Sequence, residues 1–157
     1  MTERELDLFF RKNSVQELPM HSNKVFSTNI EVRFRDLDAI GHVNNAVFFT
    51  YFEEGRKQFS KKVFDVSDVS DFEFIMAHIR CDFIRPIRLN DHVILHLWVK
   101  DIGTKSFSFE YRIVDFSDET KVYAAGESTQ VWYDYDNNRS IEVPVKMRER
   151  MTQYLKQ

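Results

Sequence analysis

The stretch that decides the fold is residues 44–63, NNAVFFTYFEEGRKQFSKKV. Its apolar positions recur at steps of three and four, the spacing that places side chains on one face of an α-helix. Asparagine is a preferred N-cap, so the pair Asn44-Asn45 predicts where this helix begins. The first half of the predicted helix is apolar nearly all round, and a helix of that kind must be wrapped by other elements. The positions in the stripe are Phe48, Phe52, Gly55, Phe59 and Val63.

The segments on either side of this helix read as strands. Residues 29–36 alternate, with Ile30, Val32 and Phe34 on one face, which predicts a half-buried strand. A polar turn over residues 38–42 separates this strand from the helix. After the helix, alternation predicts further strands over 74–83, 91–100, 106–114 and 121–134.

The end of the chain predicts a hairpin and a short helix. The polar turn at 136–139 would let a return segment at 140–143 pair with the strand before it. Pro144 then precedes a terminal helix whose apolar face includes Met147 and Met151. We expect an α+β fold in which an antiparallel β-sheet wraps around one long central α-helix. Such a sheet has open edges, so pairing with a second copy is expected, giving at least a dimer.

The length of 157 residues fits one domain, expected over 21–157, with residues 1–20 as an N-terminal arm or short helix. The four glycines lie at 41, 55, 103 and 126, too far apart for a phosphate-binding loop or a dinucleotide fingerprint. Gly55 falls on the sheet-facing stripe of the helix, where close packing would require it. Gly126, inside a long strand, predicts a bulge or bend.

Charge and cysteine content exclude several partners. The 22 Lys and Arg against 25 Asp and Glu give a net charge of −3 without long runs, so nucleic-acid binding is not expected. One cysteine, Cys81, excludes an internal disulfide. The acidic start of the chain does not resemble a signal peptide, and no apolar stretch is long enough to insert into a membrane. A cytoplasmic protein is expected.

The densest polar cluster lies between the first predicted strand and the helix. A helix N-terminus presents unpaired N–H groups that can hold a developing oxyanion, and a neighbouring carboxylate can act as base or nucleophile. These are the parts that acyl transfer needs. Spacing alone equally allows a structural role, in which the aspartates shape the turn and an asparagine caps the helix. The members are Arg35, Asp36, Asp38, His42, Asn44 and Asn45.

Other polar residues give weaker signals. His92 and His96 share a predicted strand face but lack a third ligand at a familiar spacing, so no metal site is expected. Cys81 falls on the predicted core face, where a thiol is buried and inert. No G-x-S-x-G motif is present, which excludes serine hydrolysis of the α/β-hydrolase kind.

Three motifs in order resemble one known family. Residues 32–45, VRFRDLDAIGHVNN, followed by FFTYFEEGR at 48–56, resemble the hotdog-fold acyl-CoA thioesterases of the 4-hydroxybenzoyl-CoA thioesterase type. Residues 83–91, FIRPIRLND, and residues 102–107, IGTKSF, are similar to two further motifs of that family. The resemblance covers about residues 25–145 and implies the hotdog fold.

The resemblance also implies roles for individual residues. Asp38 would be the catalytic carboxylate, either attacking the thioester or activating water, and the backbone N–H of Asn45 would polarise the thioester oxygen. Gly41 would allow the acyl group to approach closely, and His42 would be an assistant. Asp36 is expected to be structural.

The substrate implied is acyl-CoA, hydrolysed to a free acid and CoA without a cofactor, in a site shared between subunits of a homodimer or homotetramer. Phe48 would line the acyl site, where many relatives carry Tyr. Basic and hydroxyl groups implied near the CoA phosphates are Arg85, Arg88, Lys105 and Ser106.

Two alternatives stay open. The plant-type acyl-carrier-protein thioesterases have a similar motif, but Ile40 stands here where their mechanism uses Asn, which favours acyl-CoA. A hotdog module that binds acyl-CoA or a fatty acid without hydrolysing it would carry the same fold. Acyl chain length, and an aliphatic or aromatic acyl group, are not specified by these residues.

Overall fold

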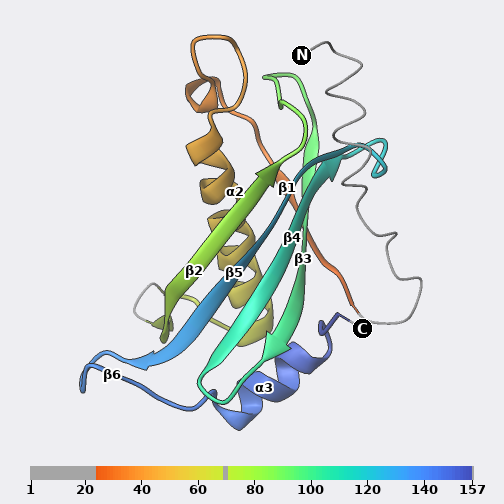
Figure 1. The fold of residues 1–157 in the computed structure, drawn as a ribbon. Helices are drawn as coiled ribbons and strands as arrows, with labels where there is room; N and C mark the ends of the chain where they lie inside the picture. Colours follow the sequence, from red (N-terminus) through yellow and green to blue (C-terminus); the bar gives the residue numbers. More distant parts are fainter. Residues whose placement is uncertain (1–23, 69–70, 157) are drawn as a thin grey trace.

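An antiparallel sheet curls around one long helix in the computed structural model, which describes residues 24–68 and 71–156 (Figure 1). The expected arm or helix over residues 1–20 lies outside these residues. In the described part the strand order is β1-β3-β4-β5-β2, with β6 pairing with β5, and every pair is antiparallel. The strands are β1 (Phe26–Ile30), β2 (Phe74–Phe83), β3 (Val93–Ile102), β4 (Ser106–Asp115), β5 (Val122–Asp134) and β6 (Arg139–Ser140). This confirms the expected fold class.

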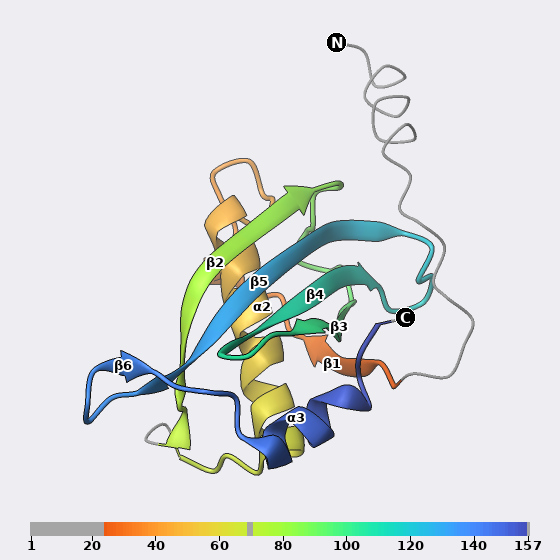
Figure 2. The same cartoon turned by 60° about the horizontal axis from the view of Figure 1, so that its bottom comes forward.

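Helix α2 (Asn45–Phe59) lies on the concave side of the sheet (Figure 2). The side chain of Asn44 caps it by accepting a hydrogen bond from the Ala46 N–H at 2.9 Å. The helix continues as a π-helical turn, η2 (Ser60–Phe64), so the expected helical stretch is confirmed. Helix α3 (Val145–Thr152) follows Pro144 as expected, and Arg150 donates from it to the Val63 carbonyl at 2.8 Å. None of the described helices is long and apolar enough to span a membrane.

The core lies between α2 and the inner face of the sheet. The expected alternation in β3 and β4 is confirmed, because Leu95 and Leu97 point inward with Phe107 and Phe109 and are fully buried. Gly55 permits the close approach of α2 to β3, since a Cβ there would lie 2.3 Å from the Leu95 side chain.

Gly126 does not mark a bulge, one of the two features, bulge or bend, that the sequence predicts there. It pairs regularly with Cys81 on β2 and Tyr111 on β4. A Cβ at this position would lie 2.5 Å from the Phe52 ring and 2.6 Å from the Arg80 carbonyl oxygen, so the glycine makes room for an aromatic ring of α2.

The strand expected over residues 29–36 is wrong in its bounds. Strand β1 ends at Ile30, and residues Phe34–Asp36 form a short 3₁₀ turn, η1. Phe34 is 81% exposed instead of lying in the core. The alternation of apolar residues there is overridden by the interaction between Arg33 and Asp36, which closes η1.

Strands β3 and β4 are buried on both faces over most of their length. Trp98 lies on the outer face and is nevertheless buried, because the cationic groups of Arg112 and Lys156 lie over its ring, each 5.9 Å from the centroid. His96, also on the outer face, is hydrogen-bonded through Nδ1 to the Ser27 hydroxyl at 2.7 Å, and His92 precedes β3.

Strand β2 is an edge of the sheet and leaves apolar side chains open. The strand is ten residues long, and along it Ile75 is 37% exposed, Met76 44% and Phe83 38%. A bulge interrupts its pairing with β5 between Met76 and His78. Cys81 is only half-buried on its inner face, and burial raises the pKa of its thiol to about 12, which keeps it protonated.

Candidate active site

The polar turn between η1 and α2 is a closed loop. The Asp38 N–H donates to the His42 carbonyl at 2.7 Å, and the Gly41 N–H donates to the Asp38 carbonyl at 3.1 Å. Gly41 has φ +78°, a left-handed conformation that L side chains rarely adopt, which explains the glycine. Leu37 and Val43 form an isolated bridge across the base of the turn.

The Asp38 carboxylate is held at one oxygen and open at the other. Its Oδ1 accepts hydrogen bonds from the Ile40 N–H at 2.9 Å and the His42 N–H at 3.1 Å. Within residues 24–68 and 71–156, no hydrogen bond reaches Oδ2. The carboxylate is therefore fixed in direction with one oxygen free to act on a ligand.

The start of α2 lies in the same turn. The Asn44 N–H donates to the Asp36 carbonyl at 2.9 Å, which ties the helix start to η1. The Asn45 residue is exposed, and its backbone N–H has no acceptor among the described residues. It opens a 15-residue helix whose dipole favours negative charge at this end. The turn therefore offers a carboxylate oxygen and a free N–H donor together.

Asp36 anchors this arrangement from below. Its buried carboxylate accepts from the Arg33 N–H at 2.9 Å, from the Arg33 guanidinium at 3.0 Å and from the Tyr51 hydroxyl at 3.0 Å. Burial raises the pKa of Asp36, but the hydrogen bonds from Arg33 and Tyr51 outweigh it and hold that pKa below its ordinary value. Burial and Asp36 together raise the pKa of the Tyr51 hydroxyl, which keeps it a donor. The structural role expected for Asp36 fits these contacts.

The contacts of Asp36 make the free energy of unfolding depend on pH. Because its folded pKa is lowered, its contribution is present above the unfolded pKa of about 4 and is lost as pH falls through the folded pKa. We expect Asp36→Asn to lower the free energy of unfolding by about 1–2 kcal/mol at neutral pH. In urea titrations the gap between wild type and variant should narrow below about pH 4. A gap that stays constant down to acid pH would contradict this account.

Two further candidate residues, His42 and Phe48, lie at different places in the site. His42 holds the turn through its backbone N–H and carbonyl. Phe48 is buried, and its ring packs edge-to-face on Phe83 of β2 with centroids 5.2 Å apart. It therefore belongs to the wall between α2 and the open edge strand.

The motif FIRPIRLND lies against the turn. The Val43 N–H donates to the Ile87 carbonyl at 2.8 Å, which brings Arg85 and Arg88 to this end of the molecule. Both arginines are exposed, and neither forms an ion pair within the described chain. Ile87 and Tyr51 are supporting residues that sequence reasoning missed, since only the tertiary fold brings them to the turn.

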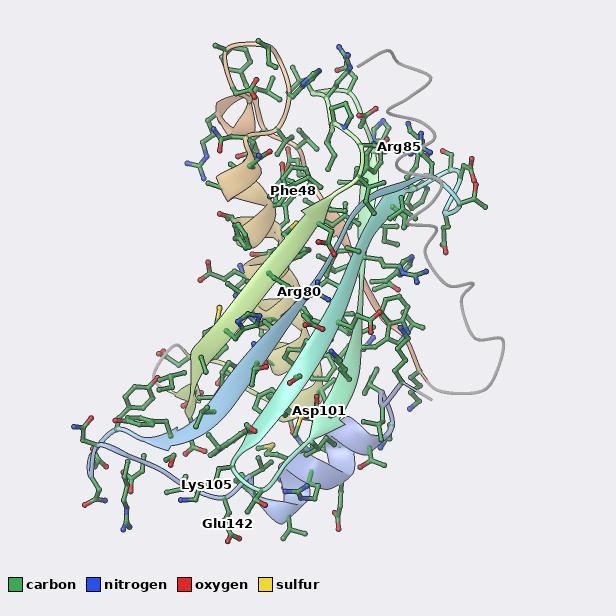
Figure 3. All side chains as sticks on the ribbon, viewed as in Figure 1. Phe48, Arg80, Arg85, Asp101, Lys105 and Glu142 are labelled. Atoms are coloured by element: carbon green, nitrogen blue, oxygen red, sulfur yellow. The ribbon has the colours of Figure 1, made fainter. Side chains whose placement is uncertain are left out.

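Lys105 and Ser106 lie elsewhere. Figure 3 shows Lys105 at the opposite end of the sheet from Arg85 and Phe48. Its ammonium group donates to the Ser140 carbonyl at 3.3 Å, and the Ser106 carbonyl accepts from the Gly103 N–H. The structure therefore does not bring these two residues to Asp38 within one protomer.

Comparison with known proteins agrees with the fold. Long-chain acyl-CoA thioesterase FadM of Escherichia coli is 25% identical over 131 residues, covering 82% of this chain and 98% of FadM. A Thermus thermophilus thioesterase, solved in complex with coenzyme A and Zn, superposes with a TM-score of 0.72 at 32% identity, covering 84% of this chain and 94% of that one.

YsmA of Bacillus subtilis is 29% identical over 86 residues, 55% of this chain, and this chain covers 58% of the length of YsmA. The sequence model of the thioesterase-like superfamily matches residues 32–151, from just before η1 to the last turn of α3. That match spans most of the chain and includes the turn, the helix and the whole sheet beyond β1. The chain belongs to the thioesterase-like superfamily.

Proposed function

We propose that this protein hydrolyses an acyl-CoA to a free acid and CoA in the turn that contains Asp38 and Asn45. The observation that carries the proposal is the free Asp38 Oδ2 beside a helix start whose N–H has no acceptor in the described chain. The similarity to FadM and to a thioesterase that binds coenzyme A supports the choice of substrate.

In the proposed reaction, Asp38 removes a proton from water while the oxygen of that water attacks the thioester carbonyl carbon. The Asn45 N–H and the positive end of α2 stabilise the negative charge that forms on the carbonyl oxygen. The C–S bond then breaks, the CoA thiolate leaves and takes up a proton, and the acid is released. Direct attack by Asp38 is the alternative course, through an anhydride that water then opens. A thiolate leaves readily, so a site without a strong acid suffices.

Three exposed arginines suit the phosphates of CoA. Arg35 lies in η1, directly before the turn, and Arg85 and Arg88 flank Ile87, whose carbonyl accepts from the Val43 N–H. None of the three has an ion pair in the part of the chain that the structure describes. Guanidinium groups bind phosphate oxygens in pairs of hydrogen bonds. The charge at this end is therefore available to an anionic ligand, although the whole chain carries a net charge of −3.

A homodimer or homotetramer is also part of the proposal. Lys105 lies at the opposite end of the sheet from Arg85, so a second copy must supply it, with its neighbour Ser106, if they bind the same substrate (Figure 3). The open apolar edge of β2 is the surface that a second copy would cover.

We expect Met76→Glu, on that edge, to shift the mass measured by light scattering from dimer or tetramer to monomer, because a charge at the interface costs several kcal/mol. Val145→Glu is the control, since Val145 is also an exposed apolar residue, at 71% against 44% for Met76, but lies on α3. A wild-type protein that is monomeric at micromolar concentration would contradict this part of the proposal.

The direct test of the activity is release of free thiol from a panel of acyl-CoAs of increasing length. Release that scales with protein concentration supports a hydrolase, and a faster reaction with carrier-protein thioesters would favour that substrate instead. Saturable binding with no thiol release would favour a binding module. A cytoplasmic location stays a prediction.

A further inference from the structure

A cluster of polar side chains interrupts the aromatic core between α2 and the sheet. The guanidinium of Arg56 donates to the Tyr111 hydroxyl at 3.2 Å, and Tyr111 shares a hydrogen bond with Ser128. The Gln130 amide donates to the Ser128 hydroxyl at 2.6 Å. Ser60 lies one turn beyond Arg56 on the helix and is also buried. We call these five residues the polar cluster.

The hydrogen-bonding capacity of the polar cluster is not used up. The Gln130 Oε1 and the Ser60 Oγ are buried and have no hydrogen-bond partner within residues 24–68 and 71–156. Arg56 is only 6% exposed, yet no carboxylate in the described residues lies within ion-pair distance of it. Leaving such groups unpaired costs about 1–3 kcal/mol each, and more for a charge, so their retention points to a ligand that completes them.

The polar cluster lies further along the same helix that begins at the active turn. Arg56 follows Asn45 by eleven residues, which is about 16 Å along the helix axis at the standard rise. The stacked rings of Phe52 and Tyr111, 4.4 Å apart, lie on the side toward the turn. The rings of Phe64 and Trp132, 5.8 Å apart, close the other side.

A row of apolar side chains on β2, here called the apolar lane, runs from the start of α2 to the polar cluster. Phe83 contacts both Phe48 and Phe49 near the helix start. Further along the inner face of β2, Cys81 pairs with Gly126 and Ile79 pairs with Ser128 of the polar cluster. Ile79 and Cys81 are half-buried, so this lane borders the open edge of the sheet.

We infer that the polar cluster binds a hydroxyl group on the acyl chain of the substrate, far from the thioester, and selects hydroxyacyl over plain acyl groups. This rests on the proposed function and assigns its substrate class. A hydroxyl fits because it accepts from the unused N–H groups of Arg56 and donates to Gln130 Oε1. A carboxylate would satisfy Arg56 but would leave Gln130 Oε1 unpaired, and a methyl end would leave both unpaired.

The experiment compares pairs of CoA esters from octanoyl to hexadecanoyl, each with and without a terminal hydroxyl. We expect the hydroxylated ester to have about ten-fold higher kcat/KM at the length that reaches the polar cluster, since one net hydrogen bond is worth about that factor. Gln130→Leu should remove this preference, so that the hydroxylated and plain esters of that length are hydrolysed with equal kcat/KM. Thr129→Val, the next residue on the outer face of β5, should keep the preference.

Folding of the variant is checked by its melting temperature. Gln130→Leu removes an unpaired buried oxygen but also the hydrogen bond to Ser128, so its melting temperature should stay within a few degrees of wild type. Ser60→Ala serves as a second variant with a smaller change in volume. Equal rates for plain and hydroxylated esters at every length would overturn the inference, and so would a preference for terminal carboxylates. Thiol release from none of the esters would instead overturn the proposed function.

Discussion

Asp38→Asn is expected to lower kcat for acyl-CoA hydrolysis by about 10²–10⁴-fold with little change in KM. The asparagine oxygen can still accept from the Ile40 and His42 N–H groups, so the turn keeps its shape. Its NH₂ group, however, occupies the position of the free Oδ2 and can neither take a proton from water nor attack a carbonyl. The loss therefore falls on the chemical step.

The control is Asp91→Asn, a second turn aspartate whose carboxylate accepts from the Arg88 N–H at 2.8 Å in the neighbouring motif. It should keep kcat within a few-fold of wild type. Steady-state thiol release for both variants, with melting curves to show that each is folded, makes the comparison. Comparable turnover by Asp38→Asn and wild type would remove Asp38 from the mechanism.

Gly126→Ala is expected to lower the free energy of unfolding by about 2–3 kcal/mol, although it adds one methyl group. That methyl would lie 2.5 Å from the Phe52 ring and 2.6 Å from the Arg80 carbonyl oxygen. Phe52 cannot turn aside because it is fully buried and stacked on Tyr111, and the carbonyl belongs to the backbone of β2. The strain must be absorbed by the sheet.

For a chain of this size the expected loss corresponds to a fall in melting temperature of about 5–10 °C. Ala125→Val is the matched control, since Ala125 is the adjacent β5 residue on the outer face and is only half-buried. It should change the melting temperature by no more than about 2 °C. A Gly126→Ala protein as stable as wild type would contradict the close packing of α2 on β5.

The central helix could be predicted from the sequence because its own residues carry the signal. The stripe of Phe48, Phe52 and Phe59 is periodic, and Asn44 caps the helix through a contact with its own neighbour. Gly55 also stood out, since a glycine on an apolar stripe has a packing reason. The packing reason for Gly126 could not be predicted, because it is the Phe52 ring of the helix α2, which is distant in sequence.

The segment before the helix shows how a local polar interaction defeats alternation. Residues 29–36 fit a strand by hydropathy, yet the Asp36 carboxylate draws in the Arg33 backbone and guanidinium and closes η1. Asp36 is buried in this interaction, whereas Phe34 points to solvent. The sequence shows that Arg33 and Asp36 are close enough to pair, but it does not show that Asp36 is buried. The effect of this ion pair on the local structure therefore could not be predicted.

The candidate site divides in the same way. Asp38, Gly41 and Asn45 are close in sequence, so their meeting in one turn follows from local geometry. Tyr51 and Ile87 reach the turn only through the fold. The resemblance placed Lys105 with Arg85 near the CoA phosphates. The order of motifs along the chain, however, does not say which protomer supplies a residue.

The measurement that tests the central claim most directly is thiol release by wild type and Asp38→Asn from one acyl-CoA, at a concentration where calorimetry shows both to be saturated. The account predicts many turnovers by wild type and at least about 100-fold slower release by the variant at equal occupancy. Equal release by the two proteins would contradict the role of Asp38. Full occupancy without thiol release by either would contradict the assignment of this turn as a hydrolytic site.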